Sequence, residues 1–119
     1  MRHRKGNKKL ARPTDQRIAL LRTLASQLFR SGQIMTTEAK AKALIGFADK
    51  LVHKAKTGDV HSLRQVREHI TNRDIIKHLV VEVVPKLGDR DGGYITAVKG
   101  FRRRGDGAPM ALVKLNIQK

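Results

Sequence analysis

The chain has 119 residues, and its 26 Lys and Arg against 10 Asp and Glu give a formal net charge of +16. This length suits one domain, and the charge favours a polyanionic partner, nucleic acid above all, because a compact chain with so many like charges repels itself. The sequence has no cysteine, which excludes thiolate metal sites. It has no apolar run of roughly 20 residues, which excludes a membrane span, and no tryptophan, which disfavours binding to a membrane surface. We therefore expect a soluble protein.

The first twelve residues, MRHRKGNKKLAR, are the most basic stretch of the chain. They hold six Lys or Arg and no acid, and too few apolar side chains to build a core. Because RNA phosphates would neutralise these charges, we predict an extended RNA-binding arm over residues 1–13 and a single domain over residues 14–119. The alternative is a solvated tail that only aids solubility. The arm's candidate contacts are Arg2, Arg4, Lys5, Lys8, Lys9 and Arg12.

A first helix is predicted over about Asp15–Arg30. Thr14 or Asp15 supplies its cap, and Ser31–Gly32 ends it. Arg17 lies on the polar face and is a candidate RNA contact. The apolar side chains at helical spacing, which we expect to face the core, are Ile18, Leu21, Leu24, Ala25, Leu28 and Phe29.

A brief strand over Ile34–Thr36 and a second helix from Glu38 to about Lys56 are predicted next. Thr37 is the expected cap of this helix. Lys40 and Lys42 are candidate RNA contacts, because backbone amides and the helix dipole favour phosphate near a helix N-terminus. Farther along the helix, RNA contact and plain solvation are equally open for Lys50, Lys54 and Lys56.

Two shorter helices are predicted over about Val60–Ile70 and Arg73–Val84. Thr71 or Asn72 is the expected cap of the second, and Pro85 is expected to stop it. The run LVVEVV within it would also suit a strand, but the apolar spacing of three and four residues favours a helix.

After residue 93 the apolar residues no longer recur every three or four positions, as in a helix, but at every second position, as in a strand. The segments YITAVK (94–99) and MALVKLNI (110–117) are predicted to pair as an antiparallel hairpin over residues 94–117, with one face exposed to solvent. The second segment places Ala111, Val113, Leu115 and Ile117 on one face.

The loop between these strands, GFRRRGDGAP, is longer than most hairpin loops. Arg102, Arg103 and Arg104 have planar guanidinium groups that suit phosphate, and Phe101 offers a ring on which an unstacked base can lie. We therefore predict that this loop probes folded RNA. The alternative places Phe101 in the core and leaves the arginines solvated. The RGD tripeptide has little weight as an integrin motif, since the sequence after MRHRK is too polar for a signal peptide and we expect no secretion.

Catalytic and metal-binding patterns are lacking. The Asp89 and Asp91 turn lacks the remaining ligands of a calcium loop, and there is no Walker loop or hydrolase nucleophile signature. The spacing of a zinc site is also missing from the histidines in predicted helices, which are His53, His61, His69 and His78. We therefore expect no enzyme activity, no cofactor and no metal.

Four stretches, MRHRK at 1–5, TTEAKAKAL at 36–44, LVHKAK at 51–56 and GGYITAVKGFRRRGDGAPMALVKL at 92–115, resemble the bacterial large-subunit ribosomal proteins numbered seventeen. The resemblance spans essentially the whole chain. It implies an α+β fold in two layers, with the order α-β-α-α-α-β-β and a small sheet. It also implies a cytoplasmic, non-catalytic role in the ribosome, with large-subunit ribosomal RNA and neighbouring large-subunit proteins near the exit tunnel as partners.

The residues that match the family's motifs lie in three places. The opening motif adds His3 to the arm's candidate contacts beside Arg2, Arg4 and Lys5. The other matches are Thr36, Thr37, Lys40, Lys42, Arg102 and the Gly105–Asp106 turn.

The chain departs from the family in two places. Gln16 stands where relatives often carry a histidine, and Ile45–Gly46 stands where they often carry a basic pair. These departures weaken the case for RNA contact in the middle of the second helix.

The main alternative is a free-standing nucleic-acid module, such as a DNA-packaging or regulatory factor, and a third class is an enzyme acting on nucleic acid. A DNA-groove reader usually dimerises and carries its base-reading side chains on one helix face, whereas the cations here spread over arm, helix and loop. An enzyme acting on nucleic acid would need carboxylates or histidines that hold a metal. We therefore expect an RNA-binding structural protein, without a DNA partner.

Overall fold

The computed structural model describes residues 14–88 and 92–117. The predicted arm over residues 1–13 lies outside them. The described elements are α1 (Thr14–Ser31), β1 (Gln33–Thr37), α2 (Glu38–Thr57), α3 (Val60–His69), α4 (Arg73–His78), a π-helical segment (Leu79–Val83), α5 (Val84–Lys86), β2 (Ile95–Arg102) and β3 (Pro109–Leu115). The α+β class and the predicted order of elements are confirmed, with the fourth predicted helix divided into three consecutive segments.

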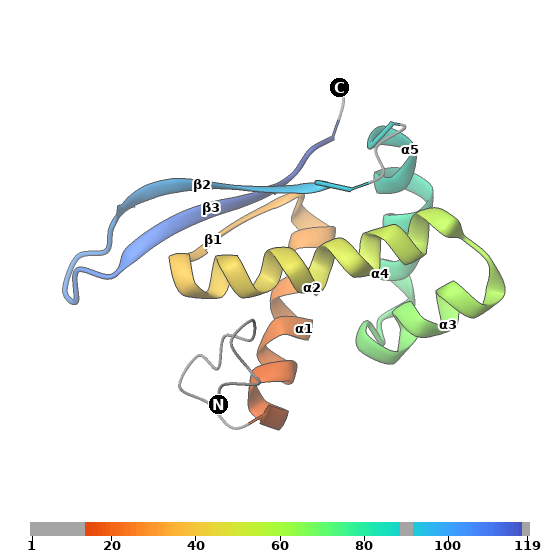
Figure 1. The fold of residues 1–119 in the computed structure, drawn as a ribbon, viewed down its shortest axis with the longest axis horizontal. Coiled ribbons are helices and arrows are strands. Elements are labelled where there is room, and N and C mark those ends of the chain that lie inside the picture. Colours follow the sequence, from red (N-terminus) through yellow and green to blue (C-terminus); the bar gives the residue numbers. More distant parts are fainter. Residues whose placement is uncertain (1–13, 89–91, 118–119) are drawn as a thin grey trace, which may run out of the picture.

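The helices lie on one side of a three-stranded antiparallel sheet, which gives two layers (Figure 1). The strand order is β1-β3-β2, so the short strand β1 pairs with the end of the chain and β3 is central. On β3, Ala111, Val113 and Leu115 are buried and Lys114 is exposed, which confirms the predicted alternation. Ile117 lies beyond the strand, where its backbone N–H donates to the carbonyl of Leu115 two residues earlier at 2.9 Å and the chain turns away from the sheet.

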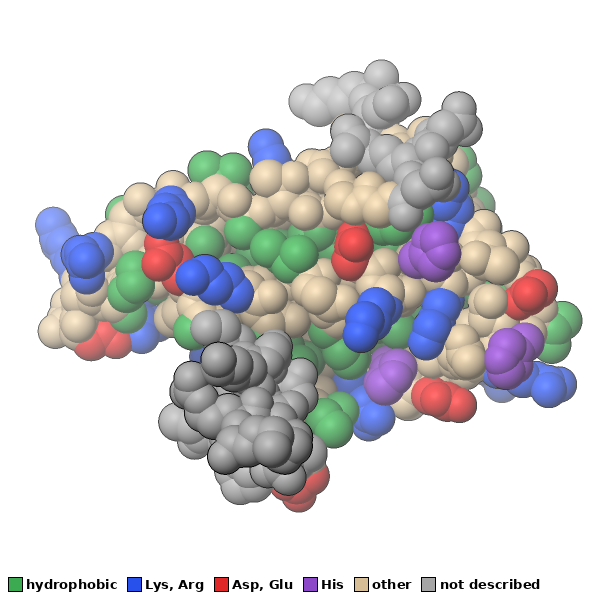
Figure 2. Space-filling model, viewed as in Figure 1, with side chains coloured by type: hydrophobic (Ala, Val, Ile, Leu, Met, Phe, Trp, Pro, Cys, Tyr) green, Lys and Arg blue, Asp and Glu red, His purple; other side chains and the backbone are tan. Residues whose placement is uncertain are grey.

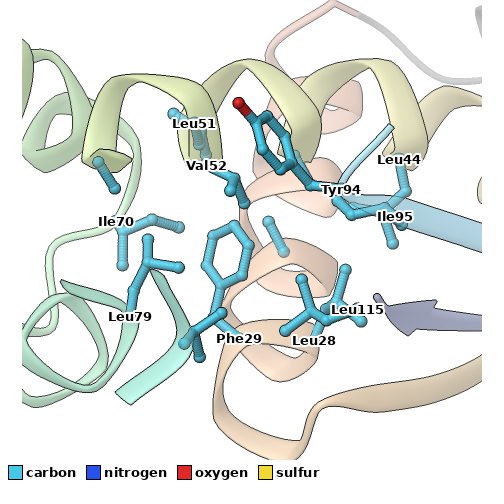
Figure 3. Packing of buried hydrophobic residues seen from close by; sticks show 14 of the residues in the cluster. Leu28, Phe29, Leu44, Leu51, Val52, Ile70, Leu79, Tyr94, Ile95 and Leu115 are labelled. Carbon is cyan, nitrogen blue, oxygen red and sulfur yellow. The ribbon is translucent and has the colours of Figure 1, made fainter. Parts of the chain in front are cut away.

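The core lies between the two layers. Figure 3 shows the ring of Phe29 at the centre of the buried cluster, between Val52 of α2 and Leu79 of the π-helical segment. Leu28 and Phe29 are both 0% exposed, as the helical spacing of α1 predicts. No helix in the described part of the chain is long and apolar enough to span a bilayer.

The helix that begins at Arg73 runs farther than predicted. Pro85 was expected to stop it, but helical structure continues to Lys86. The preceding turn is π-helical, with the N–H of Val84 donating to the carbonyl of Leu79 five residues earlier. A π-turn is wider than an α-turn, so it gives the proline ring room where an α-helix would clash with a carbonyl.

The caps differ partly from the predictions. Asn72 caps α4, since its Oδ1 accepts from the N–H of Asp74 at 2.9 Å. Thr37 occupies the cap position of α2, but its side chain makes no cap hydrogen bond. Asp59, which was not predicted as a cap, accepts from the N–H of Ser62 at 2.7 Å and starts α3.

The hairpin spans residues 95–115 rather than the predicted 94–117, and its strands extend farther toward the tip, so the loop is shorter than predicted. Strand β2 continues to Arg102, whereas residues 100–109 were expected to form the loop. Pairing resumes at Arg102 and Pro109 after a shift in register, so that Gly100 and Phe101 stand opposite Met110 in a bulge. The bulge absorbs one extra residue, which the alternation of apolar and polar residues does not reveal.

Candidate nucleic-acid interface

Within the described residues, the predicted contacts fall into three groups. Arg17 lies in α1, Lys40 and Lys42 lie near the start of α2, and Arg102, Arg103 and Arg104 lie at the hairpin tip. Figure 1 shows the first turn of α2 on the same side of the molecule as the hairpin, while the first turn of α1 points away from the sheet. The structure thus brings the start of α2 toward the hairpin and leaves Arg17 apart. The arm residues Arg2, His3, Arg4, Lys5, Lys8, Lys9 and Arg12 lie outside the described part.

The hairpin tip projects beyond the helical layer and is closed by an ion pair (Figure 1). Arg103 donates from Nη2 to Oδ2 of Asp106 at 2.6 Å and from Nε to Oδ1 at 3.1 Å. The same Oδ1 accepts from the N–H of Ala108 at 3.2 Å. The backbone of Arg103 completes the turn by donating to the carbonyl of Ala108 at 2.8 Å and accepting from the N–H of Gly107 at 2.9 Å. Asp106 therefore orders the tip of the loop.

The three arginines are consecutive in the sequence, but their side chains make different contacts. Arg102 donates to the carbonyl of Gly107 at 3.0 Å and Arg103 is held by Asp106, while Arg104 makes no hydrogen bond or ion pair within the described residues. Phe101 is 57% exposed, so the interpretation that places it in the core is wrong. An exposed ring is suited to stack on a base, and an unengaged guanidinium is suited to contact a phosphate.

Glycine permits the tight turn at this tip. Gly105 and Gly107 have φ of 96° and 67°, values that residues with a Cβ rarely adopt. The ion pair was not predicted from the sequence, although the spacing of Arg103 and Asp106 around Gly105 indicates a turn that could bring the two side chains together.

The hydrogen bond from Arg103, with that from the N–H of Ala108, lowers the pKa of Asp106 to about 2 from its ordinary 3.8. Because this pKa is depressed in the folded chain, the ordering effect of Asp106 is present above pH 3.8 and is lost as the pH falls toward 2. We expect Arg103→Gln to return the pKa toward 3.8, measured by NMR titration of the Asp106 carboxyl carbon. A wild-type carboxyl that already titrates near 3.8 would contradict the observed pairing.

The later turns of α2 hold Tyr94, which directly precedes strand β2. The N–H of Tyr94 donates to Asp49 Oδ1 at 2.9 Å, and its hydroxyl oxygen lies 3.2 Å from His53 Nδ1. The Nζ of Lys56 lies 5.7 Å from the centre of the tyrosine ring. Tyr94 is 1% exposed, so these contacts fix the start of β2 against α2 and set the direction of the hairpin.

The four described histidines, at positions 53, 61, 69 and 78, are not grouped into a metal site. The described residues hold no group of three or more His, Asp or Glu side chains suited to a metal ion. His69 packs edge-on against the ring of Phe47, with the ring centres 5.2 Å apart. Burial lowers the pKa of His69, and the positive charge of Arg22 lowers it further. The imidazole is therefore neutral near pH 7 and adds no charge to the surface.

Lys and Arg side chains are distributed along the molecule rather than gathered in one patch. Figure 2 shows them at the hairpin end, along the middle of the visible face and at the opposite, helical end. This distribution is suited to an extended polyanion that contacts several elements at once.

Comparison with known proteins gives consistent matches over almost the whole chain. Residues 20–116, which include the entire hairpin, match the family model described as Ribosomal protein L17. The chain is 47% identical over 114 residues to the large ribosomal subunit protein bL17 of Coprothermobacter proteolyticus, an alignment that covers 96% of this chain and 97% of that protein. It is also 47% identical over 116 residues to the bL17 protein of Thermus thermophilus, covering 97% and 98% of the two chains.

Proposed function

Because this chain belongs to the ribosomal protein L17 family, we propose that it binds large-subunit ribosomal RNA through its basic arm and its arginine-rich hairpin. The chain is a non-enzymatic, structural constituent of the large ribosomal subunit and works in the cytoplasm as part of the ribosome. Neighbouring large-subunit proteins near the exit tunnel are further proposed partners, on the basis of the family resemblance.

The observation that carries the RNA-binding proposal is the chemistry of the hairpin tip. It holds Phe101, Arg102, Arg103 and Arg104 exposed at the end of a two-stranded extension, with one carboxylate, Asp106, engaged in ordering the turn. Cationic groups on an ordered projection lose little conformational entropy on binding, and an exposed ring gives a stacking surface. Nothing in the helical core requires these side chains, so their position is explained by a partner.

Replacing Arg102, Arg103 and Arg104 together by Gln is expected to weaken binding to purified large-subunit RNA. If each arginine neutralises one phosphate, the slope of log affinity against log salt falls by roughly 2 to 3. The measurement is filter binding or anisotropy over a range of salt concentrations.

A matched control removes three exposed cations from other places: Arg30, Lys86 and Lys114, each replaced by Gln. The control is expected to change the salt slope by less than about one, since only the general charge is reduced. Equal losses of RNA affinity in the two triple variants would contradict a specific role for the hairpin. The hairpin arginines would then contribute only through the net charge of the chain.

A further inference from the structure

A hollow of about 540 Å³ lies where α3 meets α4, and its lining is strongly basic. Its lining residues are Arg67, Arg73, Ile76 and Lys77, and we call it the α3–α4 hollow. Figure 1 places α3 and α4 at the end of the molecule opposite the hairpin tip. The hollow is therefore separate from the hairpin and from the start of α2.

The local structure explains why the three cations converge. Arg67 lies in the last turn of α3, and Arg73 begins α4 directly after the turn. Lys77 follows Arg73 by four residues, so the two side chains lie on the same helix face. Ile76 is 8% exposed and belongs to the core cluster, and Ile70 in the intervening turn is 1% exposed. These buried side chains fix the two helices, so the hollow is formed in the free protein.

Within the described ranges, no ion pair neutralises this cluster. The side chains of Arg67, Arg73 and Lys77 are all exposed, and none of them makes a hydrogen bond or an ion pair there, although Glu68 and Asp74 are adjacent in sequence. Like charges gathered on one surface repel each other and weaken the folded state, so the cluster brings no advantage to the free chain. Two guanidinium forks and an ammonium group around one concave surface are, in contrast, a suitable arrangement for phosphate oxygens.

We propose that the α3–α4 hollow binds the phosphodiester backbone of ribosomal RNA, as a further contact surface independent of the hairpin and the arm. This inference rests on the proposed function, because it takes the same polymer as its ligand. The hollow has the volume of a small-ligand pocket, so it takes a short stretch of backbone rather than the whole width of a duplex. With cationic surfaces at both ends, one chain joins two separate segments of RNA.

The test uses the full chain and purified large-subunit RNA. A hollow triple variant, Arg67→Gln with Arg73→Gln and Lys77→Gln, is compared with the wild type and with the control triple at Arg30, Lys86 and Lys114. The hollow triple is expected to lower the salt slope by roughly 2 to 3 and the affinity at 0.1 M salt by roughly a hundredfold, whereas the control changes the slope by less than about one. Its thermal midpoint is expected to equal or exceed that of the wild type, because repulsion is removed.

Each outcome separates this inference from the proposed function. If the hollow triple matches the control triple while the hairpin triple loses affinity, the hollow inference is overturned and the proposed function stands. If the wild type itself does not bind the RNA at low salt, both fail. If the hollow triple loses binding to polyglutamate but keeps its RNA affinity, the hollow is a site for an acidic polypeptide and the inference is overturned.

Single variants keep the inference testable if the hollow triple does not fold. Arg73→Gln and Lys77→Gln are each expected to lower the salt slope by about 0.7 to 0.9 with unchanged circular dichroism. Two folded single variants with the wild-type slope would overturn the inference.

Discussion

Deleting residues 2–12 is expected to reduce the affinity for large-subunit RNA by roughly four orders of magnitude at 0.1 M salt, the largest effect of any change considered. The segment carries six Lys or Arg and no acid. If each cation neutralises one phosphate, the salt slope falls by roughly 4 to 5, and the difference in affinity grows as salt is lowered. The measurement is a salt titration of RNA binding with the deleted chain beside the full chain.

The folded body is expected to be unaffected by this deletion. The buried cluster of the described residues is drawn from Ala25 to Leu115, well after the deleted segment. Circular dichroism and the urea midpoint should therefore match those of the full chain. Unchanged RNA affinity in a folded, deleted chain would contradict the arm's role and support the interpretation of a solvated tail.

Phe29→Ala is expected to destabilise the folded chain by about 3 to 5 kcal/mol, a large fraction of the roughly 5 to 15 kcal/mol typical of a domain. The ring is 0% exposed and lies between the second helix and the π-helical segment, so its removal leaves a cavity that several elements share (Figure 3). Because the helical layer supports the hairpin, RNA binding through the hairpin should be lost at the temperature where the variant unfolds. Urea unfolding followed by circular dichroism measures the loss.

Two variants serve as controls for this prediction. Phe29→Leu keeps an apolar side chain at the site and is expected to cost less than Phe29→Ala. Val60→Ala removes apolar atoms from a side chain that is 68% exposed, and it should change stability by no more than about 0.5 kcal/mol. A similar loss from Val60→Ala and Phe29→Ala would contradict the assignment of Phe29 to the centre of the core.

Much of the fold follows from local patterns in the sequence. The helical spacing around Leu28 and Phe29 and the alternation along β3 predict which faces are buried, because each pattern is repeated over several turns or residues. The behaviour of Pro85 was not predictable in this way, because it depends on a hydrogen bond from Val84 to Leu79 that widens the preceding turn. The bulge at Gly100 and Phe101 likewise depends on pairing with a distant strand.

The sequence predicted which cations the candidate interface contains, but not the contacts that each of them makes. Three consecutive arginines indicate positive charge, yet only the folded turn shows that Asp106 holds Arg103 while Arg104 makes no ion pair within the described residues. The α3–α4 hollow was missed, because Arg67 comes from one helix and Arg73 and Lys77 come from the next. Their proximity depends on how Ile70 and Ile76 pack into the core, which no local spacing encodes.

RNA binding by the arm and the hairpin is tested most directly by ultraviolet crosslinking of the chain to RNA in intact large subunits, with the crosslinked residues mapped by mass spectrometry. We expect RNA adducts on residues of the arm and of the hairpin tip around Phe101. We expect none on buried residues of α1 such as Phe29. Adducts absent from both the arm and the hairpin in subunits that contain the protein would contradict the claim that these exposed cations bind ribosomal RNA.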